Sequence, residues 1–207
     1  MGLSLNTTTG KVVASLALVG TAAGVAGLGT YGAFTSSTSA STEVSSGTVA
    51  IALGTPGAAN RLSVAATGLV PGDTVQRAVT LTNAPGNQAL AGITLTTLAT
   101  TTSKLDTDPT LGLQLAIDNC SVPWTEAGTA PSYTYTCAGG TITQVLAPRA
   151  VIGAGLPLTG LTSTAAGNTD NLRVTLSLPA AADNTFQAKS SAIDLSFTGT
   201  QRSGASK

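Results

Sequence analysis

The stretch DTVQRAVTLTN, residues 73–83, decides the fold class, because its apolar and polar side chains follow a period of two. That period is typical of a β-strand with one buried face and one exposed face. Other stretches rich in Thr, Val, Ile and Leu follow the same pattern, and such residues favour strands. They are residues 47–53, 61–67, 90–98, 111–120, 133–137, 141–146, 171–178 and 191–199.

Turn-forming clusters such as Pro-Gly, Ala-Gly-Gly and Gly-Asn-Thr-Asp separate these predicted strands. Many short strands at this spacing predict an all-β antiparallel sandwich. A jelly roll fits the length best, and an immunoglobulin-like sandwich is the alternative. Trp124 lies between the two cysteines but next to Pro123, and not among strands as the Trp of the Cys…Trp…Cys pattern does in immunoglobulin domains. One short helical turn is expected within residues 104–112.

The N-terminus resembles a secretion signal, because the uncharged, Ala-, Val-, Leu- and Gly-rich residues 12–28 follow Lys11. A helix of that length is about 25 Å long, shorter than a hydrocarbon core of about 30 Å. We therefore predict cleavage between Ala33 and Phe34 and no membrane attachment afterwards. The predicted domains are a signal peptide (1–33), an extended segment (34–46), a β-sandwich (47–200) and a flexible tail (201–207).

The composition argues against several classes of function. Charged residues make up 9% of the chain and the formal net charge is +0, so there is no basic field to attract nucleic acid. The chain has no His, which excludes H-E-x-x-H zinc peptidases, Ser-His-Asp triads and Cys-His pairs. We predict a protein that is not an enzyme, with no catalytic residue, no metal ligand and no cofactor.

Cys120 and Cys137 are the only cysteines. In an exported chain, such a pair is most simply one disulfide. We expect it to join neighbouring strands or their connecting loop. Trp124, Tyr133 and Tyr135 form the one aromatic cluster of this region, and we interpret them as packing around that disulfide rather than as a platform for a sugar.

Two motifs resemble functional sites but have simpler structural interpretations. Asp106 and Asp108 come nearest to a metal site, yet the run lacks the further oxygen ligands and the Gly of a calcium loop. A solvated turn ahead of Pro109 is the favoured interpretation. LPLTG, residues 156–160, matches the sortase signal, but no apolar span follows it. We interpret it as a strand that carries Pro at a sheet edge or a bulge.

Three stretches together resemble the TasA/camelysin family, which Gram-positive bacteria export with a signal peptidase of the SipW type. GLGTYGAFTSS (27–37) is similar to the cleavage pattern of that family. SSGTVAIAL (45–53) and GLVPGDTVQRAVTLTN (68–83) resemble its Ser-Gly-Thr strand and its Pro-Gly-Asp turn. LPAAADNTFQAKSSAIDLSFTGTQ (178–201) resembles its closing pattern. The middle of the chain, roughly 100–170, matches no pattern of the family, and the cysteine pair departs from its best-known members.

The resemblance implies a secreted jelly-roll subunit of cell-surface or biofilm-matrix fibres. It also implies that an N-terminal strand of one subunit completes a sheet of the next, so the main partner is a second copy of the chain. The candidate donor is the extended segment 34–46, with Phe34 and Val44 as its large apolar contacts. The dedicated signal peptidase is a further partner, and the sequence leaves open whether an accessory protein nucleates the fibre. A monomeric module that binds the surface or the matrix is the alternative function.

Overall fold

The computed structural model describes residues 35–38, 51–53 and 64–202. The chain divides into two units, residues 1–33 and 34–207, and all described residues belong to the second unit. The predicted cleavage site at Ala33 and Phe34, the donor contact Val44 and most of the predicted tail lie outside the described residues. Gln201, which we assigned to that tail, is the last residue of a strand.

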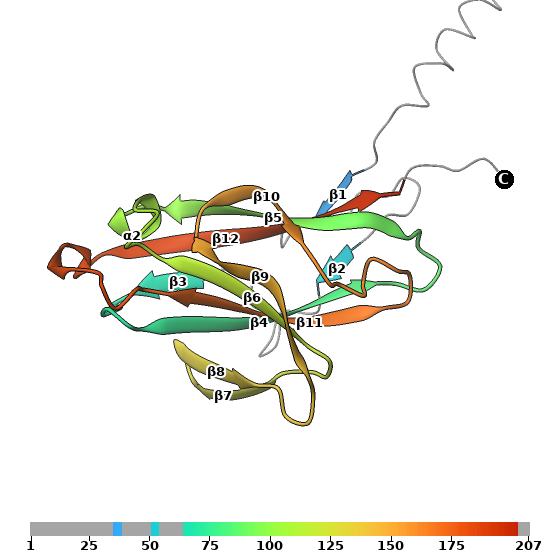
Figure 1. Cartoon of the computed structure of the whole chain (residues 1–207), viewed down its shortest axis with the longest axis horizontal. Helices are drawn as coiled ribbons and strands as arrows, with labels where there is room; N and C mark the ends of the chain where they lie inside the picture. The colour runs from blue at the N-terminus through green and yellow to red at the C-terminus, as the bar shows by residue number, and fades with distance from the viewer. Residues whose placement is uncertain (1–34, 39–50, 54–63, 203–207) are drawn as a thin grey trace, which may run out of the picture. The chain divides into compact units, whose positions relative to one another are not determined.

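Two antiparallel sheets form the body of the second unit (Figure 1). Sheet A contains β1 (Thr35–Thr38), β3 (Val64–Thr67), β12 (Ser190–Gln201), β5 (Leu90–Thr101) and β10 (Gly153–Leu158). Sheet B runs in the order β2 (Ile51–Leu53), β4 (Thr74–Asn83), β11 (Thr169–Ser177), β6 (Gln114–Cys120) and β9 (Ile142–Ala150).

The connectivity is that of a jelly roll. In sheet A the main strands lie in the order β3, β12, β5, β10, and in sheet B in the order β4, β11, β6, β9. Numbered along the chain from β3 and without the β7–β8 hairpin, these are strands 1-8-3-6 and 2-7-4-5, the double Greek key of a jelly roll. The structure therefore confirms the predicted all-β sandwich and its jelly-roll form, and the immunoglobulin-like alternative is wrong. The short strands β1 and β2 are additions at the sheet edges.

Alternating side chains fill the space between the sheets, as the period of two predicts. On β4 the buried Val79 and Leu81 face this core, and on β12 Ile193, Leu195 and Phe197 do so. The Pro71-Gly72 turn starts β4: the N–H of Asp73 donates to the carbonyl of Val70, and Gly72 takes φ +95°, which favours glycine.

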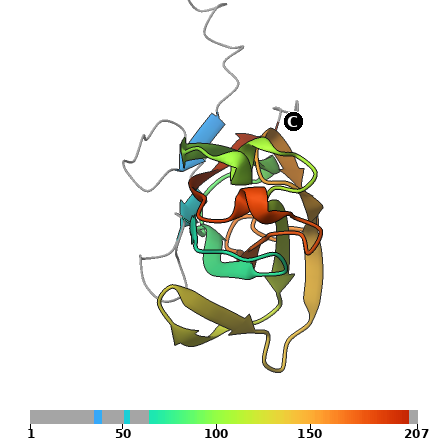
Figure 2. The same cartoon turned by 90° about the vertical axis from the view of Figure 1, so that its left-hand side faces the viewer.

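Two short helices, α2 (Lys104–Thr107) and η1 (Asn184–Phe186), lie at the same end of the sandwich (Figure 2). The side chain of Lys104 connects them, because its ammonium lies 4.3 Å from the ring centre of Phe186. The helical turn expected within 104–112 is therefore confirmed. Sequence analysis did not predict η1.

A hairpin of β7 (Thr125–Thr129) and β8 (Ser132–Thr136) stands off the outer side of sheet B (Figure 1). The chain leaves sheet B at the end of β6 and returns to it at β9, so the hairpin is an insertion between neighbouring strands. Sequence analysis predicted β8 but not β7, whose sequence TEAGT has no large apolar residue.

Candidate functional site

The outer edge of β12 is shared by two short strands from the N-terminal part of the chain. β1 pairs with residues 197–200 of β12, and β3 pairs with residues 190–193. On its other side, β12 is paired with β5 along almost its full length. The edge of a twelve-residue central strand is thus completed by two four-residue pieces.

Sheet B has a similar edge at β4, on the side of the sandwich where β12 carries β1 and β3 in sheet A. The described strand next to the outer edge of β4 is β2, which pairs Ile51 with Asn83 and Leu53 with Leu81. β4 extends from Thr74 to Asn83, so this described pairing covers only its last three residues. The segment that follows the predicted cleavage site therefore contributes an edge strand to each sheet.

The donor segment 34–46 is only partly described. Residues 35–38 of it form β1, with Thr35 opposite Thr200, Ser37 opposite Thr198 and Thr38 opposite Phe197. The predicted contacts Phe34 and Val44 lie outside the described residues. Main-chain pairing at a strand edge, rather than a pocket, is thus the described feature of this segment.

The predicted disulfide is confirmed: Cys120 at the end of β6 is bonded to Cys137, which follows β8. It joins the base of the hairpin to sheet B. Gly140 lies against it, since a Cβ at this position would come within 2.8 Å and 2.9 Å of the two sulfur atoms. A side chain at Gly140 would therefore require Val122 or the disulfide to shift.

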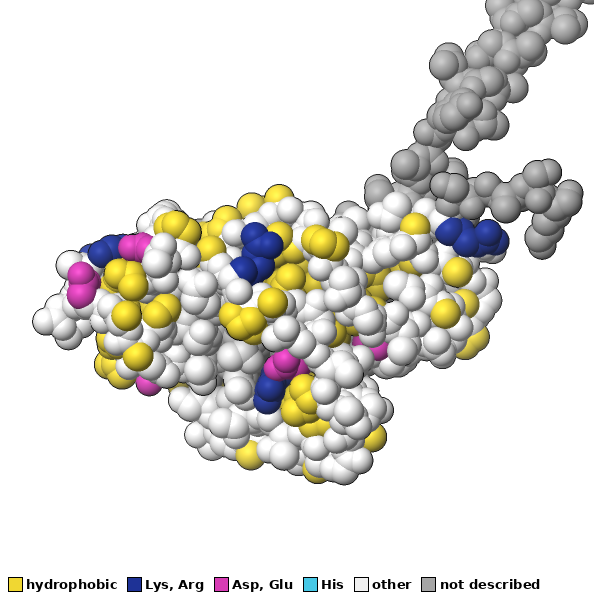
Figure 3. Space-filling view, in the orientation of Figure 1, with side chains coloured by type: hydrophobic (Ala, Val, Ile, Leu, Met, Phe, Trp, Pro, Cys, Tyr) yellow, Lys and Arg dark blue, Asp and Glu magenta, His cyan; other side chains and the backbone are white. Residues whose placement is uncertain are grey.

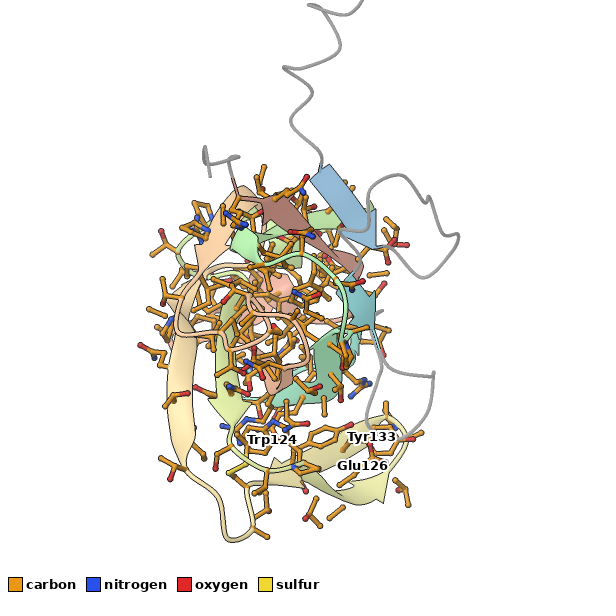
Figure 4. All side chains as sticks on the ribbon, turned by 90° about the vertical axis from the view of Figure 1, so that its right-hand side faces the viewer. Trp124, Glu126 and Tyr133 are labelled. Atoms are coloured by element: carbon orange, nitrogen blue, oxygen red, sulfur yellow. A yellow bond between two sulfur atoms is a disulfide. The ribbon has the colours of Figure 1, made fainter. Side chains whose placement is uncertain are left out.

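The aromatic cluster packs the hairpin onto the outer face of sheet B (Figure 4). Trp124 is 7% exposed, and its indole N–H donates to the carbonyl of Asn171 over 2.8 Å. The guanidinium of Arg173 lies 4.5 Å from the Trp124 ring centre and binds Asp118 at 2.7 Å. Tyr135 is also buried, and its hydroxyl donates to Glu126 over 2.5 Å.

These contacts agree with the packing interpretation of the aromatic residues. A sugar platform needs an exposed ring face, whereas Arg173 covers a face of Trp124. A small hollow beside Trp124 is lined by Ala78, Val79, Thr80, Pro123 and Asn171. We assign it no ligand.

Asp106 and Asp108 are capping residues of α2. Asp106 accepts hydrogen bonds from the Ser103 N–H, the Thr102 hydroxyl and the Ser191 hydroxyl. Burial acts to raise the pKa of Asp106, but these hydrogen bonds outweigh it, so the pKa lies below its ordinary value. The N–H groups of Leu111 and Thr110 hold the pKa of Asp108 below its ordinary value in the same way. The two carboxylates thus belong to the turn that sequence analysis expected.

The LPLTG motif lies at the edge of sheet A. Leu156 and Leu158 are buried, while Pro157 is exposed and lies on β10, the last strand of the sheet. A register shift between Gly153 and Leu156 marks a bulge. The interpretation as a strand with Pro at an edge and a bulge is confirmed.

Two charged residues with a structural role were missed by sequence analysis. Asp170 is 1% exposed, and its carboxylate accepts from Asn119, from the N–H and hydroxyl of Thr162, and from the N–H of Ser163. Arg77 is 6% exposed; its guanidinium donates to the carbonyls of Gln76 and Pro131. Each residue lies on the same face of its strand as the neighbouring core residues, and this alternation was the only indication in the sequence that its side chain is buried.

Charged side chains are few and scattered on the face shown in Figure 3. Among residues 35–38, 51–53 and 64–202, no group of three or more acidic or Cys side chains could hold a metal ion. Within the same residues, no helix is both long and apolar enough to span a bilayer. No family model, no curated protein and no solved structure matches this chain.

Proposed function

We propose that this protein is a secreted structural subunit of bacterial cell-surface or biofilm-matrix fibres, and that it polymerises by strand addition between copies. The observation that carries the proposal is the main-chain pairing of β1 with the edge of β12. β1 begins one residue after the expected new N-terminus at Phe34. Cleavage there would leave this strand at a free chain end, which another copy can accept.

The physical basis is that an open strand edge presents unpaired N–H and C=O groups to any chain that can align with it. A β1 strand from a neighbour would make the same main-chain pairs with β12 that β1 makes within its own chain. Pairing alone then favours neither form, so assembly depends on protein concentration and on the segment that links β1 to β2. The low content of charged residues, 9%, weakens repulsion between copies.

A pair of cysteines placed across the β1–β12 register tests the proposal. Ser37 and Thr198 lie opposite each other. Facing residues in an antiparallel pair have Cα atoms about 4.5–5.5 Å apart, within the range that a disulfide spans. The described residues contain no free cysteine, so Ser37→Cys with Thr198→Cys adds the reactive thiols. The single variants are the matched controls.

Two orders of oxidation give opposite expectations. Oxidation of dilute, cleaved protein should lock β1 within its own chain and prevent filament formation, as seen by negative-stain electron microscopy. Oxidation after assembly should instead link neighbouring chains and give a ladder of covalent multimers on a non-reducing gel. Filaments that contain only links within one chain would contradict strand exchange.

A monomeric matrix-binding module is the competing function. Its candidate aromatic residues pack between the hairpin and sheet B, so no described contact favours it. Cleaved protein that stays monomeric at every concentration would favour this function over the fibre subunit.

A further inference from the structure

The side of the sandwich opposite the β12 and β4 edges ends in β9 and β10. These strands are consecutive in the chain, and residues 151 and 152 carry it from sheet B to sheet A. The buried hydroxyl of Thr97 fixes this crossing: it donates to the carbonyl of Val151 over 2.6 Å and accepts from the N–H of Gly153 over 2.9 Å. On this side, a two-residue crossing of the chain therefore connects the edge strand of sheet B directly to the edge strand of sheet A.

Each of the two edge strands carries a proline. Pro157 lies in β10 opposite Thr94 of β5, and it is exposed. Pro148 lies in β9, is also exposed, and falls where the register shifts between the Leu115–Arg149 and Ile117–Leu146 pairs. Because proline has no N–H, it cannot donate to a strand added at the edge.

Bulges interrupt both edges as well. β10 has an extra residue between its pairs with Thr97 and Leu95, and β9 has register shifts on either side of its pair with Ile117. A bulge bends and twists a strand, so an incoming straight strand loses its alignment after a few residues. Arg149, exposed on β9, adds a charge to this edge. Edge prolines, bulges and charges are means by which β-proteins prevent edge-to-edge pairing.

The opposite edges differ from this side in their prolines, although they too carry charges: Asp194 is exposed on β12, and Arg77 lies on β4. No proline lies in β12, β4, β1, β2 or β3. The described N-terminal strands there are only three or four residues long. The two sides of the sandwich thus differ in proline, which lies in both edge strands of the β9–β10 side and in none of the described strands of the other side.

We propose that the β9–β10 side is a built-in block to strand addition, with Pro148 and Pro157 as its key residues, and that it keeps each filament one subunit wide. This inference rests on the proposed function. The partner that the block excludes is a second copy of the chain, because an unblocked β10 edge could pair with β10 of a subunit in a neighbouring filament. Growth is then confined to the β12 and β4 side.

The test compares filaments of the cleaved protein with those of Pro148→Thr, Pro157→Thr and the double variant. Threonine restores the N–H and favours strands. Pro85→Thr is the matched control, because Pro85 is exposed in the turn between β4 and β5. Thermal unfolding of each variant establishes that it folds, and the single variants remain informative where the double variant does not fold.

We expect single filaments for the natural sequence and for Pro85→Thr, and filaments paired side by side, about twice as wide, for the double variant. Folded variants whose filaments keep the natural width would overturn the block while leaving the fibre function intact. Absence of filaments from every protein, the natural sequence included, would instead refute the fibre function and this inference with it.

Discussion

Deletion of residues 34–46 should leave the sandwich folded but unable to polymerise. The deletion removes β1, which makes four register pairs with β12. Alternate pairs of an antiparallel ladder exchange two hydrogen bonds, so about four main-chain bonds are lost. At about 0.5–1.5 kcal/mol net for each bond, the loss is about 2–6 kcal/mol.

Chain entropy offsets most or all of this loss, because the truncated protein no longer has to order the four residues 35–38. Ordering the backbone costs about 1–2 kcal/mol for each residue. The main core is untouched, since its described residues run from Val64 to Phe197. We therefore expect the free energy of unfolding to fall by no more than about 2 kcal/mol, which for a domain of this size lowers the midpoint by up to about 4–8 °C.

The assay combines thermal unfolding with sedimentation and electron microscopy of cleaved and truncated protein at equal concentrations. Replacing residues 39–46 with a Gly-Ser segment of equal length, which retains β1, is the matched control and should still polymerise. Truncated protein that forms filaments as readily as the intact chain would refute donation from this end. A truncated protein that is unfolded would refute the estimate that β1 contributes little to folding.

Three further predictions concern groups outside the pairing of β1 with β12. Asp170→Ala should lower the free energy of unfolding by at least about 3 kcal/mol in chemical denaturation, because it leaves several buried donors without an acceptor; a loss below about 1 kcal/mol would contradict this role. Replacing Cys120 and Cys137 by Ala should lower the free energy of unfolding by about 3 kcal/mol and shift the fluorescence of Trp124, the only tryptophan, to longer wavelength. Unchanged emission would show that the hairpin stays packed without the disulfide. Because the pKa of Asp106 is lowered in the folded protein, its carboxylate stabilises the fold above the unfolded pKa of about 3.9, and this contribution is lost as the pH falls through the lower folded pKa. Asp106→Asn should therefore flatten the decline of the unfolding midpoint below about pH 4. An unchanged decline in acid would exclude Asp106 as a cause.

Local sequence patterns were sufficient wherever a feature depends on neighbouring residues. The period of two identified most strands, and the clusters of Gly, Pro and Asn marked the turns between them. Asp106 and Asp108 were expected in a turn because their hydrogen bonds reach groups only a few residues away, apart from the bond to Ser191. The hairpin strand β7 was missed because it packs one half-buried side chain, Glu126, and has no apolar alternation.

Charged residues at inward-facing strand positions can be recognised in the sequence, but their structural role cannot. Arg77 and Asp170 occupy strand positions of inward parity, between or beside apolar residues that are buried. The sequence alone does not identify the groups that form hydrogen bonds with these two side chains. Those partners come from Pro131 in the hairpin turn and from Asn119 on β6, far away in the chain.

The sequence by itself determined the fold class, the strand faces, the disulfide and the absence of His-dependent chemistry, because each follows from residue type and short spacing. The tertiary structure decided which strands are neighbours and hence which edges remain at the sides of the sheets. Pairing in a jelly roll joins residues as distant as Ser37 and Thr198, and no local periodicity encodes such a pairing. The sequence placed Pro157 at an edge or a bulge, but only the tertiary structure decided that its strand β10 has β5 as its single partner.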